Sequence, residues 1–310
     1  MTDLLRSENG LPSMSGESAA ETRRPLAVPA RAQLPAPDVA LPIHGPRPAP
    51  PSRMVLEGLA EVSSATASSI LFHAGIARSS ITGPAALTKG RKVVGAAHTL
   101  QFMPRREDIV ATIAEAAGLP QEFAESRSAL WGALEASDTG DVLVVSANGD
   151  PHTGCLGEML LFYLQAQGGI GAVVDGSIRD TPRLGNLELG LWASGVTPNF
   201  ASQGALYPWA YEVPIACGGV LVLPGDIIIA DDDGAVAIPA RLAEFVAEHA
   251  QHHEEWEEFS RARIAAGGSL TRYYPLVDED AWQEYETWRA QQESAGDRAG
   301  RSGAHPGAGT

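Results

Sequence analysis

Lysine and cysteine are scarce in this chain of 310 residues, and each scarcity excludes a class of chemistry. The two lysines, Lys89 and Lys92, lie in one basic turn, where a solvated side chain is favoured. A Schiff-base enzyme needs instead a desolvated lysine of lowered pKa. The two cysteines, Cys155 and Cys217, form neither a disulfide framework nor a metal-binding CxxC pair, which is typical of a reducing compartment. Any carbonyl chemistry is therefore expected to be metal-assisted.

Long apolar runs and clustered positive charge are also missing. No apolar run approaches the ~18 residues of a membrane span, and the charged N-terminus has no apolar stretch typical of a signal peptide. A net charge of -16 disfavours nucleic acid as a ligand, because phosphate binding relies on clustered lysine and arginine. We therefore predict a cytoplasmic protein that binds neither membranes nor nucleic acid.

Composition divides the chain into three parts. Residues 1–53 are rich in proline and alanine, and residues 291–310 are rich in glycine, serine, alanine and arginine. Such segments bury too little apolar surface to fold, so we predict a disordered arm and a disordered tail. Residues 54–290 are predicted to form the domain, and the hydrophobic content of 44% is enough for a sizeable core.

The apolar pattern within the domain predicts alternating helices and strands. Strands are expected at residues 93–102, 142–145 and 170–174, and later at 220–223, 227–229 and 235–238. Helices are expected at residues 63–74, from about 107, at 121–136, 157–167 and 182–189, and over a long stretch from Pro239. Because residues 142–145 are continuously apolar, that strand should be covered on both faces.

Two polar stretches outside this pattern have alternative interpretations. Residues 231–233 are three aspartates before Gly234, which is compatible with a calcium loop or with a turn between two strands. The spacing is not that of an EF-hand, which favours the turn. On the long helix, His249, His252 and His253 could bind a metal, although histidines beside glutamates on a helix more often face solvent.

The segment with most functional information joins a glycine turn to an Arg-Asp pair. Residues 154–158 read Gly-Cys-Leu-Gly-Glu before a predicted helix, and Arg179 and Asp180 follow the next predicted strand. A glycine turn that opens a helix offers free N–H groups and a positive dipole end to an anion. Arginine grips a carboxylate, and aspartate holds a hard divalent cation. The pattern predicts a site for a 2-oxoacid and a metal; the alternative is a surface turn in which the pair is merely structural.

Residues 154–180, together with 215–219 and 224–234, resemble the RraA-like family. The resemblance extends over roughly residues 56–276. This family includes 4-hydroxy-4-methyl-2-oxoglutarate/4-carboxy-4-hydroxy-2-oxoadipate aldolases and the regulator of RNase E activity. The resemblance implies a layered α/β sandwich of the swivelling-domain type with a long C-terminal helix. It also implies a homotrimer, or a hexamer built as a dimer of trimers, with the active site between subunits.

The resemblance also implies roles for individual residues. Arg179 would bind the substrate carboxylate, and Asp180 would hold Mg²⁺ or Mn²⁺, largely through waters. The backbone of Gly157, Glu158 and Met159 would bind the pyruvyl group. Glu158 stands where the aldolases commonly carry aspartate, and it joins Arg179 and Asp180 in the expected catalytic set.

Two further features of the family are less easily transferred. A glutamate from the C-terminal helix of a neighbouring subunit completes the family's site, and Glu254, Glu255 and Glu257 are the candidates here. The basic residue that often follows the Thr-Pro or His-Pro turn is replaced by Asn199-Phe200. This change could alter the partner of a second substrate carboxylate.

The expected activity is that of a class II, metal-dependent pyruvate aldolase. It would cleave a 4-hydroxy-2-oxoacid to pyruvate by retro-aldol chemistry, with oxaloacetate decarboxylase side activity, because both reactions pass through pyruvate enolate. One alternative is a dehydratase or decarboxylase of a sugar-derived 2-oxoacid. Another is a non-enzymatic regulator of a ribonuclease.

Overall fold

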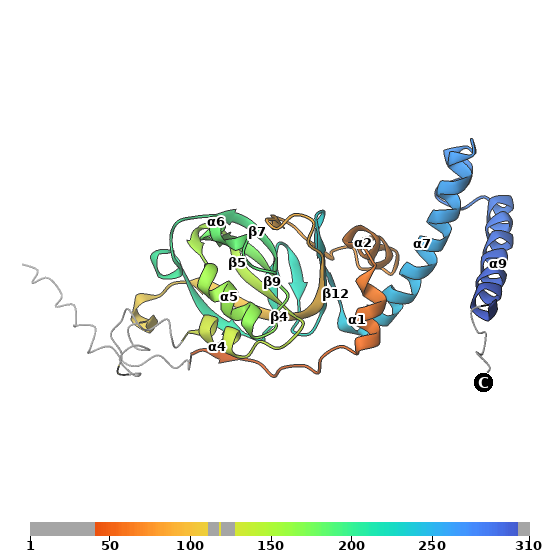
Figure 1. Cartoon of the computed structure of the whole chain (residues 1–310). Helices are drawn as coiled ribbons and strands as arrows, with labels where there is room; N and C mark the ends of the chain where they lie inside the picture. The colour runs from red at the N-terminus through yellow and green to blue at the C-terminus, as the bar shows by residue number, and fades with distance from the viewer. Residues whose placement is uncertain (1–40, 111–117, 119–127, 303–310) are drawn as a thin grey trace, which may run out of the picture. The chain divides into compact units, whose positions relative to one another are not determined.

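A computed structural model describes residues 41–110, 118 and 128–302 of the chain (Figure 1). Most of the predicted arm, and much of the helices predicted from about residue 107 and over 121–136, lie outside these residues. Among the described residues, none of the helices combines the length and the apolar character that crossing a bilayer requires.

Ten strands form one sheet in the described part of the chain, and its centre is parallel. The parallel strands are, in spatial order, β4 (Val93–Pro104), β5 (Asp141–Gly154), β6 (Gly171–Ile178) and β7 (Gly190–Val196). Antiparallel strands flank them: β11 (Ile227–Asp231), β12 (Gly234–Ile238) and β2 (Ser80–Ile81) beyond β4, and β3 (Ala85–Ala86) beyond β7. The later part of β4 also pairs with β8 (Leu206–Tyr211), which pairs with β1 (Ile43–His44), while β9 (Ile215–Cys217) and β10 (Val220–Val222) form a separate hairpin.

Helices connect and cover these strands. They are α1 (Arg53–Ala60), α2 (Ser64–His73), α4 (Ala129–Glu135), α5 (Glu158–Ala166), α6 (Thr181–Leu184), α7 (Ala243–Ala265), α8 (Leu270–Tyr273) and α9 (Glu279–Ser302), with 3₁₀ turns η3 (Ala201–Gln203) and η4 (Ala240–Leu242). The α/β class and the long helix after Pro239 are confirmed. Helix α9 was not predicted, and it continues past residue 291 into the segment whose composition predicts a tail.

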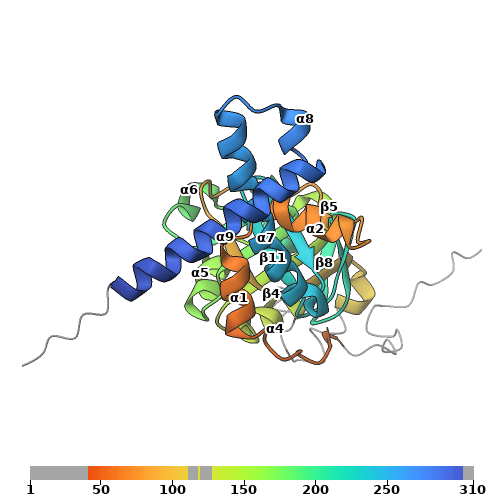
Figure 2. The ribbon, with the colours of Figure 1, turned by 90° about the vertical axis from the view of Figure 1, so that its right-hand side faces the viewer.

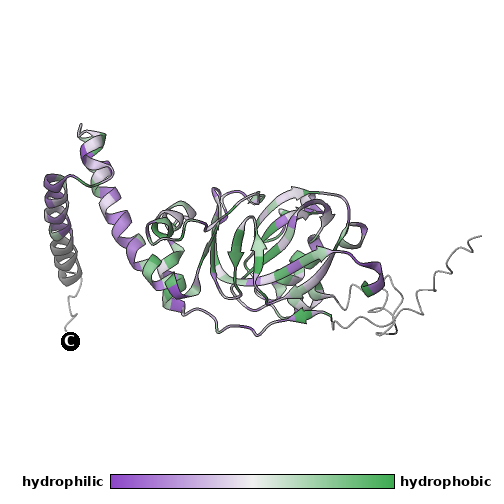
Figure 3. Cartoon of the chain, turned by 180° about the vertical axis from the view of Figure 1, so that it is seen from behind, coloured by the Kyte–Doolittle hydropathy of each residue, from purple (hydrophilic) through white to green (hydrophobic). Residues whose placement is uncertain are grey.

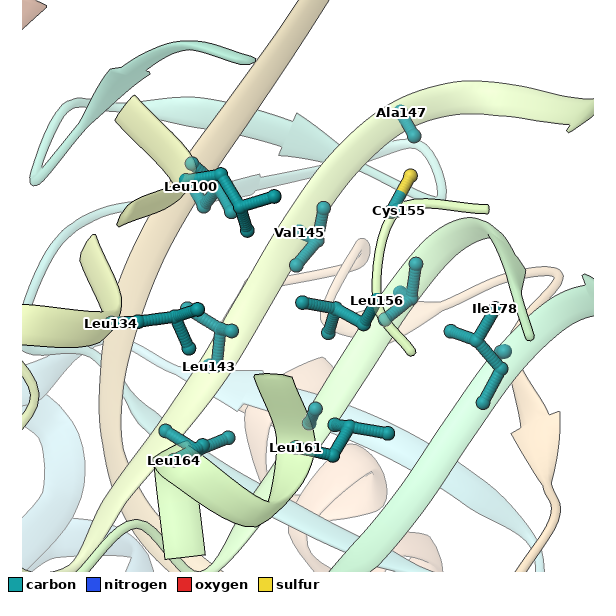
Figure 4. Close-up of a cluster of buried hydrophobic side chains, with 14 of the residues drawn as sticks. Leu100, Leu134, Leu143, Val145, Ala147, Cys155, Leu156, Leu161, Leu164 and Ile178 are labelled. Carbon is teal, nitrogen blue, oxygen red and sulfur yellow. The ribbon is translucent and has the colours of Figure 1, made fainter. Parts of the chain in front are cut away.

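Both faces of the parallel strands are buried, as the apolar run at residues 142–145 predicts. Leu143 and Val145 pack with α4 and α5 in one cluster (Figure 4). Val142 and Val144 face the opposite cluster, to which β9 and β10 contribute. A third cluster joins β11 and β12 to α1, α2 and α7, and Figure 2 shows α1 and α7 close to β11. Beyond this contact α7 is largely hydrophilic (Figure 3).

Five strands in the sheet are absent from the sequence prediction: the two-residue strands β1, β2 and β3, and the longer β7 and β8. β7 contains glycine, alanine and serine, which have low strand propensity, and it forms by pairing with β6 and β3. β8 contains Pro208, which normally argues against a strand. It pairs with β4 beside a register shift at Gln101 and Phe102, where the ladder is already irregular. Helix α6 is shorter than predicted and ends at Leu184.

The aspartates at 231–233 form the predicted turn, which joins β11 to β12. The Asp231 carboxylate accepts hydrogen bonds from the Ser64 N–H at 2.8 Å and the Ser64 Oγ at 2.6 Å. It therefore ties the turn to the start of α2, where Ser63 is the side-chain cap. Burial alone would raise the pKa of Asp231, but the hydrogen bonds from Ser64 and Asp233 hold it below its usual value.

Replacing Asp231 by alanine is expected to lower the free energy of unfolding by about 2 kcal/mol at pH 7, since hydrogen bonds to a charged acceptor are lost. Because the folded-state pKa is lowered, this stabilisation is present above the ordinary value of 3.8 and is lost as pH falls through the folded-state pKa. Urea denaturation at pH 7 and at acid pH measures both effects. Asp233→Ala, at an exposed position of the same turn, is the control and should change stability little. An equal loss in the two variants would contradict the assignment.

The three histidines of α7 make contacts along their own helix. His249 Nδ1 lies 2.8 Å from the carbonyl oxygen of Phe245. His252 and His253 pair with glutamates at 3.9 and 3.8 Å. No group of three His, Cys, Asp or Glu side chains in the described ranges is placed to hold a metal ion.

Residues 41–53 are ordered against the sheet, although composition assigns them to the arm. In β1, Ile43 and His44 pair with Ala210 and Tyr211 of β8, and the His44 and Tyr211 rings stack with centroids 5.5 Å apart. Residues 45–52, named here the strap, then lead into α1. The structured region therefore begins before residue 53.

Candidate functional site

The β5–α5–β6 unit brings the predicted glycine turn beside the predicted Arg-Asp pair. Cys155 N–H donates to Ser177 O at 2.9 Å, and Arg179 N–H donates to Leu156 O at 3.0 Å. The turn before α5 thus runs alongside the end of β6. This is the carboxyl end of the parallel strands, where α/β folds place their ligand sites.

Two apolar side chains anchor this turn. Cys155 and Leu156 are fully buried and point into the core cluster beside Ala147 and Ile178 (Figure 4). Burial raises the pKa of the Cys155 thiol, so the thiol stays protonated and is unsuited to nucleophilic attack. The core therefore holds the first part of the turn in place, and the backbone N–H groups that could contact a ligand begin at Gly157.

The Arg179–Asp180 site lies at the N-terminus of α5. Asp180 Oδ2 accepts a hydrogen bond from the Glu158 N–H at 3.2 Å and lies 3.5 Å from Arg179 Nε. The two side chains are 37% and 40% exposed, so a ligand can reach them. One of the three residues predicted to offer backbone N–H groups to a substrate, Glu158, therefore directs its N–H to Asp180.

Gly157, the N-cap of α5, lies close to both charged side chains. An added Cβ would lie 2.7 Å from Arg179 Nε and 2.7 Å from Asp180 Oδ2. Its φ of -120° suits any residue, so the constraint is the close approach of the two charged side chains. Asp180 itself has a φ of 62°, a left-handed conformation that aspartate adopts more readily than most residues.

Phe200 contributes to the site in a way that sequence reasoning did not identify. The Arg179 guanidinium carbon lies 5.9 Å from the Phe200 ring centroid, within cation–π range. The neighbouring Asn199 is held against the end of β5, where its Nδ2 donates to His152 O at 3.1 Å. Gly154 allows this approach, since an added Cβ would lie 2.1 Å from Asn199 O. The only signal in the sequence is the departure from the family pattern at these two positions.

Two of the three candidate glutamates of α7 pair with arginines of the same chain, and the third lines a cavity. Glu255 pairs with Arg289 at 3.3 Å, and Glu257 pairs with Arg261 at 3.7 Å. Glu254 lines a cavity between α1 and α7. None of these contacts in the described part of the chain involves Arg179 or Asp180. A glutamate of α7 could therefore complete the site only from another copy of the chain.

Comparison with known proteins places this fold in a family. The sequence matches the profile of the RraA-like family, described as Aldolase/RraA, over residues 60–237. The chain belongs to the RraA-like family. The resemblance seen at residues 154–180 is thus confirmed, and the fold is the α/β sandwich of that family with a long C-terminal helix.

Individual relatives of this RraA-like protein have different descriptions. It is 32% identical over 142 residues to the "Putative 4-hydroxy-4-methyl-2-oxoglutarate aldolase" of Halalkalibacterium halodurans. The matched residues are 46% of this chain and 67% of that relative. It is 50% identical to Streptomyces coelicolor RraAS2, described as an unusual member of the RNase ES inhibitor RraA protein family. That structure has a TM-score of 0.62 and covers 69% of this chain and 99% of its own. An uncharacterized protein from Pseudomonas syringae shares the fold. It is 24% identical, and its structure has a TM-score of 0.58 and covers 73% of this chain and 99% of its own.

Proposed function

We propose that this RraA-like protein is a divalent-metal-dependent lyase that cleaves a 4-hydroxy-2-oxoacid to pyruvate. The observation that carries the proposal is the convergence of the Arg179 guanidinium, the Asp180 carboxylate and the N-terminus of α5 within hydrogen-bonding distances. The description of the Halalkalibacterium halodurans relative supports the substrate class.

Arg179, Phe200 and the first turn of α5 would each bind a different part of a 2-oxoacid or support a group that does. The planar fork of Arg179 binds the C1 carboxylate, and the Phe200 ring supports the guanidinium from one side. The first turn of α5 adds backbone N–H groups and the positive end of its dipole, through Gly157 and Met159. Arg179 then shares the negative charge that develops on the enolate oxygen as the C3–C4 bond breaks.

A divalent cation fits the donor set of this site. Mg²⁺ is commonly held by one or two carboxylates and otherwise by waters and substrate oxygens. Asp180 offers a partly exposed carboxylate, and Glu158, whose backbone N–H contacts Asp180, carries a second carboxylate. A bound Mg²⁺ or Mn²⁺ would supply Lewis acidity toward the carbonyl and carboxylate oxygens of the substrate.

The proton and electron flow also suits these residues. Retro-aldol cleavage removes the C4 hydroxyl proton and leaves the C3–C4 electron pair as pyruvate enolate. The carboxylates of Glu158 and Asp180 accept hydrogen bonds and can orient a water for that proton. Oxaloacetate loses CO₂ to give the same enolate, so decarboxylation is proposed as a side activity.

The site borders an exposed apolar surface, which supports the proposed trimer or hexamer. Met159 and Phe162 on α5 are 68% and 51% exposed, and Val196 and Phe200 across the site are 56% and 41% exposed. Exposed apolar residues gathered in this way mark interaction surfaces. A neighbouring copy placed there would exclude water from the Arg179–Asp180 site and could bring one of the α7 glutamates to it.

The proposal predicts pyruvate release from 4-hydroxy-2-oxoacids that stops with EDTA and returns with Mg²⁺ or Mn²⁺. A coupled pyruvate assay over a panel of 4-hydroxy-2-oxoacids and oxaloacetate measures it, with Asp180→Ala as the variant that should stay inactive at any metal concentration. Release that is indifferent to EDTA would contradict the metal. Disappearance of an oxoacid without pyruvate would instead support a dehydratase.

A second function, inhibition of a ribonuclease by protein contact, is favoured by the 50% identity to RraAS2. The same preparations separate the two proposals. If the chain is only an inhibitor, wild type and Asp180→Ala should slow RNA cleavage by an RNase E-type enzyme equally, and neither should release pyruvate.

A further inference from the structure

The cavity between α1 and α7, named here the α1–α7 groove, contains no residue of the Arg179–Asp180 site. The two helices lie side by side (Figure 1), and the groove between them has a volume of about 610 Å³. Helix α7, and α1 up to residue 59, lie outside the residues 60–237 that match the family profile. The groove is thus separate from both the family match and the proposed lyase site.

The floor of the groove is made of small and apolar residues. The helices approach closely at Gly58, where an added Cβ would lie 3.2 Å from the Ala247 Cβ. Val55 and Ala250 also line the floor and are buried, while Met54 at the edge is 74% exposed. Small side chains on two adjacent helices leave a furrow into which a third helix can pack, as in helix-in-groove recognition.

Four glutamates surround this floor, and no positively charged residue of the described structure lines the groove. They are Glu61 at the end of α1 and Glu244, Glu248 and Glu254 of α7. All four are exposed, and none has a cationic partner among the described residues. Glu248 follows Glu244 by one helical turn, a spacing at which like charges repel. The groove therefore carries negative charge that the described part of the chain does not neutralise.

We propose that the α1–α7 groove binds a basic amphipathic helix of another protein. The apolar stripe of that helix would pack on Gly58 and Ala247, and its lysine or arginine side chains would pair with the glutamates on both sides. Glu244 and Glu254 are ten residues apart, about 15 Å along α7, which matches about three turns of a partner helix.

Charge argues against the other occupants of the groove. A second copy of this chain carries the same net charge of -16 and would be repelled by the glutamates. Residues 1–40 contain four arginines against five acidic residues, so this segment of the chain is not basic. An uncharged apolar ligand would leave the glutamates without partners. The complementary occupant is therefore a positively charged segment from outside this chain.

The test uses the full-length protein and two labelled synthetic peptides of about 16 residues, enough for four helical turns. One peptide has alanine and leucine along one face and lysine and arginine beside it. The other has the same composition, with its basic residues spread over all faces. Fluorescence anisotropy should show saturable binding of the amphipathic peptide in the micromolar range, and binding of the redistributed peptide should be weaker by roughly fivefold or more because no continuous apolar stripe is buried.

Variants at exposed positions assign the binding to the groove. Glu61→Lys combined with Glu248→Lys reverses one charge on each helix and should weaken binding of the amphipathic peptide by roughly tenfold or more. Met54→Ser removes an exposed apolar contact and should weaken it by about threefold. Glu258→Lys, the matched control, makes the same charge change on α7 outside the groove lining and should alter binding by less than about twofold. Circular dichroism verifies that each variant folds.

The proposal is overturned if the amphipathic peptide does not bind saturably, if the redistributed peptide binds as tightly, or if the Glu61→Lys, Glu248→Lys double variant binds like wild type. It is also overturned if spermidine, a polycation without apolar side chains, displaces the peptide at equal concentration. Light scattering tests the remaining occupant, because a change of oligomeric state in the double variant would assign the groove to a second copy instead. None of these outcomes bears on the proposed lyase, which is measured by pyruvate release.

Discussion

Replacing Arg179 by alanine is expected to lower kcat/KM for pyruvate release by a factor of about 10³. The guanidinium would bind the substrate carboxylate in the ground state and share the enolate charge in the transition state. Loss of one such preorganised donor typically costs about 10²–10³ in rate, and a charged fork costs more than a neutral donor. Steady-state kinetics with the Mg²⁺-loaded protein measures the change.

Two further variants make this result specific. Arg179→Lys keeps the positive charge but loses the planar fork, so it should recover only a small part of the lost activity. Arg183→Ala removes an exposed arginine on the adjacent helix α6 and should leave kinetics unchanged. Normal turnover by Arg179→Ala, or an equal loss in Arg183→Ala, would show that the pair at the end of β6 is not the substrate site.

The second large effect is expected from a single methyl group, in Gly157→Ala. The new Cβ would displace the Arg179 and Asp180 side chains, each of which has an atom 2.7 Å from the Cβ position. A misplacement of about 1 Å in an active site can cost about 10² in rate, so kcat/KM should fall by about that factor. The helix should still form, because the extended backbone conformation at 157 suits alanine, although alanine is a weaker N-cap than glycine.

Gly185→Ala is the matched control for this prediction. An added Cβ at Gly185 meets no atom of the described structure within 4 Å, and its φ of -63° is helical. This variant should therefore retain full activity. Circular dichroism and the Tm of both variants separate a local displacement from a loss of folding. Full activity in Gly157→Ala would mean that the observed placement of Arg179 and Asp180 is not the working one.

Two regions of the molecule differ in how far sequence alone could predict their arrangement. The approach of the glycine turn to Arg179 and Asp180 was predicted because these residues belong to one β5–α5–β6 unit, in which short-range chain geometry places a helix N-terminus beside the end of the next strand. The contacts of Arg47 with Asp138, Asp141 and Glu212 were not predicted. These residues come from three segments distant in the chain, and composition placed Arg47 in the arm.

Elements with a strong local pattern were likewise predicted, and those that depend on partners were not. The strand at 142–145 and the turn at 231–233 are confirmed because each follows from its own residues. Strand β8 carries a proline and exists because it pairs with β4 and β1. Strand β1 has only two residues and is formed by β8 in turn.

The amino-acid sequence by itself was sufficient for the α/β class, which follows from apolar periodicity, and for the approach of the glycine turn to Arg179 and Asp180, which follows from short-range spacing; the family followed from the resemblance at residues 154–180. Only the tertiary structure decided that Gly157 lies against both charged side chains, that Phe200 lies beside Arg179 and that the strap borders a cavity at the start of β5. The physical reason is that close approach, ring contact and charge balance depend on distances between atoms that are far apart in the chain, and these distances are set only when the core packs.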